Sequence, residues 1–194
     1  NTVYIPLFEF TNTYTHQNFK LNSPSFGNVR QNVSFWFMFN ERPIEEQQIF
    51  KFGPVYITTK GERVYYNGKE IIETYMLDTW IMIFISVTEE QFVRIYVNTS
   101  LVIEEFVDSE DFSCEVGGEN SFANWKIGGI IRFFEGECSD ELLNDVYANG
   151  PGCTSVASLK ETYMYTSGML VDFETGKINQ KTISCNTMPV VTQK

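Results

Sequence analysis

The chain of 194 residues has the length of one large all-β domain, so we expect a single hydrophobic core. Its 25 acidic residues outnumber the 14 lysines and arginines, and the formal net charge is −11. Nucleic acids and anionic membranes bind clustered cations, so this composition argues against both as partners. The apolar runs are too short to cross a bilayer as helices, so direct membrane insertion is not expected.

The first segment, residues 3–10, alternates between apolar and polar positions and contains Pro6. A proline removes a ladder hydrogen bond, so this segment is predicted to be an edge strand. Residues 11–28 are polar, with Ser-Pro and Phe-Gly steps, and predict a long loop with a short strand near 18–22.

Residues 33–39 and 80–87 are rich in aromatic and β-branched side chains, which are typical of strands. Both alternating faces of each segment are apolar, for example Phe35 and Phe37 against Trp36 and Met38. One face is expected to meet a second sheet. The other needs a cover from the chain's own loops, from the C-terminal segment or from a partner, and we favour the chain itself.

Further strands are predicted at 47–52 and 55–59, followed by a hairpin over 64–72. Its Asn67-Gly68 step supplies the two positive φ angles of a type I′ turn. Another hairpin spans 92–102, with Asn98-Thr99-Ser100 at its tip, and a short helix is expected at 139–148. The strands together predict an all-β sandwich.

The order of these segments resembles the laminin G and pentraxin-like branch of the concanavalin A-like lectin/glucanase superfamily. The similarity is carried by Ser34-Phe-Trp, by the turn before Trp80, by Arg94-Ile-Tyr-Val, by Trp125-Lys-Ile-Gly-Gly and by the closing helix at 139–148. It implies a two-sheet antiparallel jelly-roll β-sandwich over residues 1–150. Residues 151–194 depart from the family pattern, and we expect an extension that packs back on the sandwich rather than the start of another module.

Four cysteines and two glycosylation sequons, at Asn32 and Asn98, favour an extracellular or cell-surface glycoprotein that follows the secretory pathway. Asn98 is the better acceptor, because Asn32 leads into a buried strand. A composition poor in Ala and rich in Phe, Ile, Asn and Glu suggests a protist source.

Two disulfides are expected, Cys114–Cys138 and Cys153–Cys185, although four cysteines allow three pairings and the sequence does not choose among them. Each of these bonds would close a loop of roughly 25 to 30 residues.

No catalytic residues are predicted. Glycoside cleavage needs two carboxylates on one face, and the strand that carries them in hydrolytic relatives is missing from the sequence. Calcium is the one cofactor expected, because the resembling domains often bind it at one rim through hard oxygen ligands. Asp108, Glu110 and Asp111 are the candidate ligands, with Asp78 as a second choice if its turn reaches the same end. A solvated acidic loop is the alternative interpretation of these residues.

The sequence thus predicts a non-enzymatic, lectin-like binding domain of a larger surface or secreted protein, with a glycan or protein ligand. One alternative is a structural subunit of an extracellular filament or coat, within a larger complex, and a glycoside hydrolase is a more remote one. In the structural-subunit alternative, exposed aromatic rings would pack on neighbouring subunits, with candidates at Tyr65, Tyr66, Tyr75, Tyr163 and Tyr165.

Overall fold

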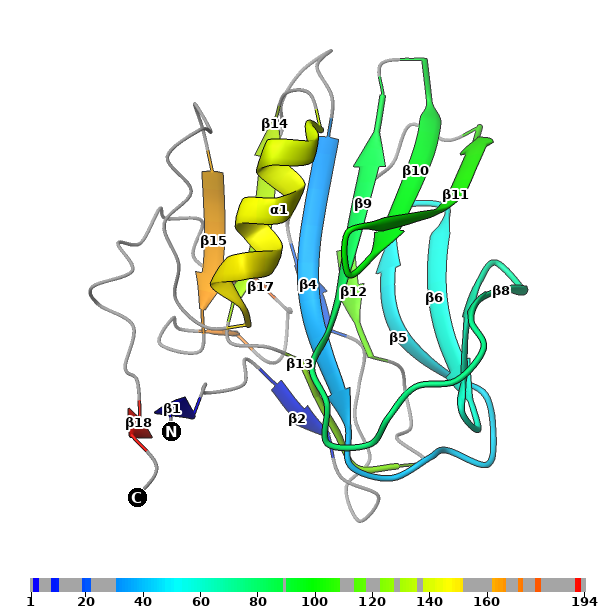
Figure 1. The fold of residues 1–194 in the computed structure, drawn as a ribbon, viewed down its shortest axis with the longest axis vertical. Helices are drawn as coiled ribbons and strands as arrows, with labels where there is room; N and C mark the ends of the chain where they lie inside the picture. The colour runs from blue at the N-terminus through cyan, green and yellow to red at the C-terminus, as the bar shows by residue number, and fades with distance from the viewer. Residues whose placement is uncertain are drawn as a thin grey trace.

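Strands arranged in two antiparallel sheets make up most of the described chain (Figure 1). The computed structural model describes residues 2–3, 8–10, 19–21, 31–88, 90–108, 114–117, 123–127, 130–135, 138–151, 162–166, 171–172, 177–178 and 191–192. Their arrangement confirms the predicted all-β sandwich with one short helix.

The larger sheet has eight strands among the described residues. Their order is β11 (Ser100–Phe106), β10 (Phe92–Val97), β9 (Ile81–Val87), β4 (Gln31–Phe39), β13 (Trp125–Ile127) and β2 (Phe8–Phe10). Further along β4, β14 (Ile130–Glu135) pairs with it and with β15 (Thr162–Thr166), so part of the C-terminal extension joins this sheet. β2, the C-terminal end of the edge strand predicted over residues 3–10, lies at the end of this strand order, whereas Pro6 lies outside the described residues.

The smaller sheet has six described strands. Their order is β3 (Phe19–Leu21), β12 (Cys114–Val116), β5 (Gln47–Phe52), β6 (Val55–Lys60), β7 (Arg63–Tyr66) and β8 (Lys69–Ile72). Two short ribbons complete the described strands: β1 (Thr2–Val3) with β18 (Val191–Thr192), and β16 (Val171–Asp172) with β17 (Lys177–Ile178).

The main core lies between the sheets and is built from alternate residues of each strand. β4 contributes Val33, Phe35, Phe37 and Phe39, all essentially without exposed surface. Phe35 stacks on Phe50 of the smaller sheet with ring centroids 4.2 Å apart, and this contact joins the two layers.

A second, smaller core covers the opposite face of the larger sheet. Helix α1 (Asp140–Asn149) lies across this face, in front of β4 and β14 in Figure 1. The members of this core are Trp36, Met82 and Phe84 of the sheet and Leu142, Leu143 and Val146 of the helix. The predicted cover is therefore supplied by the chain itself.

Local sequence signals fix the helix ends. Ser139 is the N-cap, and its Oγ accepts a hydrogen bond of 3.1 Å from the Leu142 amide. Asp140 and Glu141 in the first turn interact favourably with the helix dipole. Gly150 ends the helix with a positive φ of 79°, so α1 occupies nearly the span predicted for it.

The two sheets are also connected along one edge of the sandwich. Lys69 of β8 pairs in register with the buried Tyr66, so its side chain lies on the inner side of the smaller sheet. There its Nζ forms an ion pair with Glu105 of β11, the edge strand of the larger sheet. Hydrogen bonds from Lys69 and then from Tyr66 lower the pKa of Glu105.

Candidate functional site

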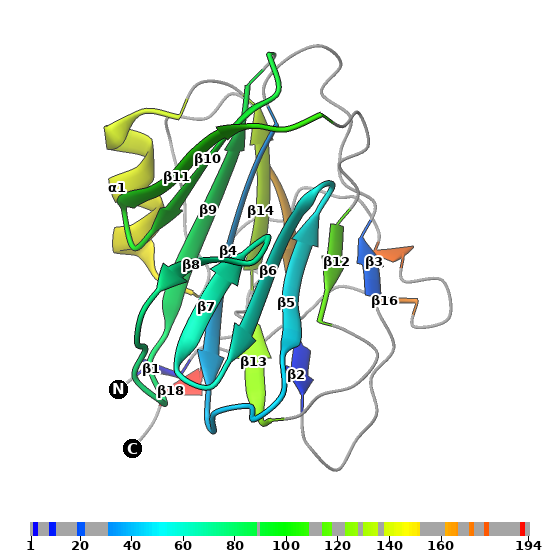
Figure 2. The ribbon, with the colours of Figure 1, turned by 90° about the vertical axis from the view of Figure 1, so that its right-hand side faces the viewer.

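The outer faces of the two sheets differ in what covers them. Helix α1 lies on the outer face of the larger sheet, whereas no described helix lies on the outer face of the smaller sheet. Figure 2 shows α1 at the left of the molecule and β5, β12 and β3 at the right, on the opposite side. Among the described residues, the outer face of the smaller sheet is therefore the one without a helical cover.

Two cross-strand rows cover this open face. The first row runs from Glu115 through Lys51 to Tyr56, and the second from Gln48 through Thr58 and Tyr65 to Glu70. Residues paired in register point to the same side of a sheet, so each row is one continuous strip of side chains. We call these seven residues, together with Arg63, the tyrosine face.

Ion pairs organise the first row. Lys51 Nζ lies 4.0 Å from the carboxylate of Glu115 and 5.2 Å from the ring centroid of Tyr56. The side chain of Tyr56 is 42% exposed, which makes it the most accessible aromatic ring of the face. Gln48, at the start of the second row, is held by a hydrogen bond of 2.7 Å from its Nε2 to the carbonyl of Gly117.

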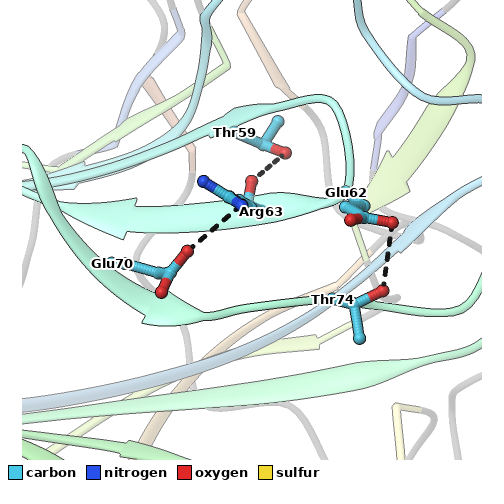
Figure 3. Close-up of polar contacts among 5 residues, drawn as sticks. All are labelled: Thr59, Glu62, Arg63, Glu70 and Thr74. Atoms are coloured by element: carbon cyan, nitrogen blue, oxygen red, sulfur yellow. Dashed lines mark hydrogen bonds and ion pairs between the residues drawn. The ribbon is translucent and has the colours of Figure 1, made fainter.

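The second row ends in a similar polar contact. Arg63 Nε lies 3.3 Å from Glu70 across β7 and β8, as Figure 3 shows. A side-chain hydrogen bond with Tyr65, followed by the charge of Glu70, raises the pKa of Arg63. Figure 3 also shows the buried Thr59 hydroxyl donating 2.9 Å to the Arg63 carbonyl, which fixes the backbone beneath this contact. Each half of the face therefore combines one tyrosine with one pair of opposite charges.

A different surface forms where the connections at one end of the sandwich meet. Ile44 is 85% exposed and Met76 is 73% exposed. Both flank the same turn. The Gly61 amide donates a hydrogen bond of 2.7 Å to the Pro43 carbonyl, and the Tyr75 amide donates one of 3.1 Å to the Glu62 carbonyl. We call Ile44 and Met76 the apolar tip. Exposed acidic residues belong to the same connections, at Glu45, Glu46, Glu62 and Glu73.

The predicted calcium ligands are only partly described. Asp108 is exposed at the end of β11, whereas Glu110 and Asp111 lie outside the described residues. Among described residues, no group of three or more potential ligands comes together.

Asp78 is at the other end of the larger sheet. Its amide donates 2.8 Å to the Phe39 carbonyl, next to the start of β9, and its Oδ1 accepts from Asn40. Asp108 is at the opposite end of β9, because the amide of the adjacent Val107 donates a hydrogen bond to the carbonyl of Gln91, which follows the end of β9. The length of β9 separates these ends by roughly 20 Å. The condition for Asp78 to join this rim, that its turn reaches the same end, is therefore not met.

The two sequon asparagines occupy unlike environments. Asn32 lies in β4 with no exposed surface, so the folded chain has no room for a glycan there. Asn98 lies at the β10–β11 turn and is partly exposed. The predicted ranking of the two acceptors has a structural basis, and glycan attachment itself stays a prediction.

The expected disulfide between Cys114 and Cys138 does not form. Cys114 is buried in the core between the sheets, where burial raises the pKa of its thiol well above the ordinary value. Cys138 packs against the helix-covered core on the far side of the larger sheet. A sheet thus stands between the two sulfur atoms. Cys153 and Cys185 lie outside the described residues.

The aromatic candidates were only partly correct. Tyr65 belongs to the tyrosine face, but Tyr66 and Tyr75 are buried. Tyr163 and Tyr165 are in β15, where side chains are not described. Tyr56 was missed, although it alternates with the apolar Val55 and Ile57 and so had to point outward.

Comparisons with known proteins place the fold but not a family. No family model matches the chain, and no curated protein matches it significantly. None of the described helices is long and apolar enough to cross a bilayer.

Solved structures show similar folds. The botulinum neurotoxin serotype D binding domain superposes with a TM-score of 0.51 and 17% identity, over 72% of this chain and 44% of that chain. A mutant of HCR/D superposes with a TM-score of 0.51 and 16% identity, over 76% of this chain and 46% of that chain. Trypanosoma rangeli sialidase superposes with a TM-score of 0.50 and 10% identity, over 66% of this chain and 24% of that chain. The chain thus spans less than half of each of these three chains, and the likeness concerns the fold alone.

Proposed function

We propose that this chain is a non-enzymatic, laminin G-like and lectin-like binding domain of a larger extracellular or cell-surface protein. Its ligand is a glycan, bound on the tyrosine face. The observation that carries the proposal is a sheet face without a described helical cover, on which Tyr56 and Tyr65 stand among hydrogen-bonding side chains. The binding domains among the structural neighbours support a general binding role.

The chemistry of the face favours a neutral sugar over a charged ligand. Lys51 with Glu115, and Arg63 with Glu70, pair one cation with one anion. Paired charges attract ions weakly, but their remaining lone pairs and N–H groups can bond to hydroxyls. Tyrosine adds a flat apolar ring with a polar edge, which suits the C–H face of a pyranose.

The spacing of the carboxylates opposes hydrolysis on this face. Glu115 belongs to β12 and Glu70 to β8, which are four strand spacings apart in the sheet. At about 4.8 Å per spacing, they are separated by roughly 19 Å. Glycosidases hold their two carboxyl groups about 5 to 9.5 Å apart. A sialidase among the structural neighbours therefore brings no catalytic pair to these residues.

A glycan array followed by titration of the best binders tests the proposal. Tyr56→Ala and Tyr65→Ala should each weaken binding at least tenfold, because each removes a stacking surface. Tyr147→Ala is the matched control, since Tyr147 is equally exposed, at 41%, but lies on α1. Equal loss in all three variants, or sugar release by the wild type, would contradict a non-enzymatic site on this face.

Calcium is retained as a proposal at Asp108, Glu110 and Asp111. The exposure of Asp108 at the end of β11 supports a rim site. Isothermal titration with Ca²⁺ tests it, and Asp111→Ala should abolish the signal. Glycan binding to the tyrosine face should survive chelation, because that face uses none of these residues.

A structural subunit is the second candidate, and the apolar tip favours it. Two large apolar side chains this exposed are typical of protein contacts. The acidic residues of the same connections would suit a basic partner surface. Concentration-dependent growth in size-exclusion chromatography, lost in Ile44→Ser with Met76→Ser, would support assembly over sugar binding.

A further inference from the structure

The two asparagine-led hairpin turns of this fold have one feature in common and one difference. Asn67 and Gly68 have φ of 46° and 83°, and Asn98 and Thr99 have φ of 46° and 76°. These are type I′ turns, with positive φ at both central residues. In each turn, the asparagine Oδ1 accepts a hydrogen bond from a backbone amide of the neighbouring strand. Asn67 accepts from Tyr56 at 2.8 Å, and Asn98 accepts from Met82 at 2.9 Å.

The nitrogen of the side-chain amide distinguishes the turns. Asn67 Nδ2 donates 2.9 Å to the Pro54 carbonyl. Asn98 Nδ2 makes no hydrogen bond within the described part of the chain, although its Oδ1 is fixed by Met82. Asn98 is also the one that begins a sequon, with Ser100 two residues later. The nitrogen that would carry a sugar is thus held in one orientation, and no described residue accepts a hydrogen bond from it.

An aromatic residue precedes Asn98 on the same hairpin. Tyr96 is two residues before Asn98, and its side chain is partly buried against the helix-covered core on the outer side of the larger sheet. Tyr96 pairs in register with Phe84, one position beyond Met82 on that side of β9, and the two rings meet edge to face at 5.9 Å. Its partner on β11, Leu101, is 48% exposed. Helix α1 thus leaves the outer face of this hairpin partly uncovered.

We propose that Asn98 carries an N-linked glycan whose first sugar lies on the ring of Tyr96. The sugar's apolar C–H face meets the aromatic ring, and its polar groups stay in water. The occupant of this uncovered face is then part of the glycoprotein itself. The proposal rests on the secretory placement in the proposed function, but not on any ligand of the tyrosine face.

Occupancy is tested by expressing the chain behind a secretory leader in a eukaryotic host and mapping glycopeptides of the folded, secreted product. Asn98 should be occupied and Asn32 unoccupied, since a glycan on Asn32 would prevent β4 from pairing. Asn98→Asp keeps the side-chain oxygen that accepts a hydrogen bond from the Met82 amide, but it cannot carry the glycan. Ser100→Ala removes the sequon, and with it the glycan, while Asn98 stays unchanged. Both variants should fold. An unmodified Asn98 in folded protein, or a glycan on Asn32, would overturn the proposal.

The position of the first sugar needs a separate readout. Enzymatic removal of the glycan should lower the melting temperature by a few degrees in the wild type. In Tyr96→Leu, which keeps an apolar contact with Phe84, removal should produce no shift. An equal shift in both proteins would overturn the contact with Tyr96. Retained glycan-array binding by Ser100→Ala would separate this site from the tyrosine face.

Discussion

The outer faces of the two sheets show how alternate residues decide whether a sheet is covered or open. On the larger sheet the outward positions of β4 and β9 include Trp36, Met82 and Phe84, and α1 buries them. On the smaller sheet the outward positions are Gln48, Thr58 and Tyr65, and no described helix covers them. Apolar outward residues require a cover, whereas polar ones with paired charges can face water and a ligand.

The strongest test of this contrast is Trp36→Ala. Trp36 is 8% exposed and stacks on Tyr147 of α1 at 5.6 Å, so truncation removes the contact that anchors the helix. We expect the free energy of unfolding to fall by about 3 to 5 kcal/mol, measured by urea denaturation. Tyr56→Ala on the open face should change it by less than about 0.5 kcal/mol. Comparable losses would show that the two faces are energetically alike.

The hairpin turns provide the next test, with effects of opposite sign. Gly68 has a positive φ, and a methyl group there would meet nothing within 4 Å, so Gly68→Ala isolates the backbone cost. We expect a loss of about 1 to 2 kcal/mol. Thr99→Gly in the larger sheet relieves a positive φ at a β-branched residue and should gain roughly 0.5 to 1 kcal/mol. Chemical denaturation measures both, and equal signs would exclude turn strain as the cause.

The helix cap should have a moderate effect confined to the covered face. Ser139→Ala removes the acceptor for the Leu142 amide. The expected loss is about 1 kcal/mol, and Ser139→Asp should restore most of it. Hydrogen exchange should show faster exchange in α1 and unchanged protection in the smaller sheet. Faster exchange throughout both sheets would mean that the helix and sandwich unfold as one unit.

The smallest effect is expected at the Lys69–Glu105 ion pair, which belongs to both sheets. Folding lowers the pKa of Glu105, so its stabilising contribution is present above the ordinary carboxyl pKa and is lost as pH falls through the lowered value. Glu105→Gln should flatten the pH dependence of the unfolding free energy below pH about 4.5, and Lys69→Met should act similarly. An unchanged slope in both variants would exclude the pair from acid destabilisation.

The sequence was most informative where chemistry is local. Asn67-Gly68 fixes its turn through the φ angles that it permits, and Ser139 and Gly150 fix the ends of α1. Alternation along β4 predicted that both faces are covered. It could not show that α1 is the cover, because that depends on where residues 140–149 return in space.

Site prediction failed where residues distant in sequence had to be placed relative to one another. Cys114 and Cys138 lie on opposite sides of the larger sheet. The length of the loop between two cysteines does not show on which side of a sheet each one lies. Asp78 and Asp108 lie at opposite ends of β9 for a similar reason. Tyr66, in contrast, was open to correct prediction, because it shares the parity of the apolar Val64.

The inward ion pair of Lys69 and Glu105 also bears on how this protein avoids self-association. Both residues lie in edge strands, β8 and β11, whose outer backbone groups could pair with another molecule. A strand added at either edge would have to accommodate a charged side chain directed into the sandwich, and natural sheets use such charges to discourage this pairing. The Lys69–Glu105 ion pair is therefore expected to disfavour the addition of a strand from another molecule at both edges.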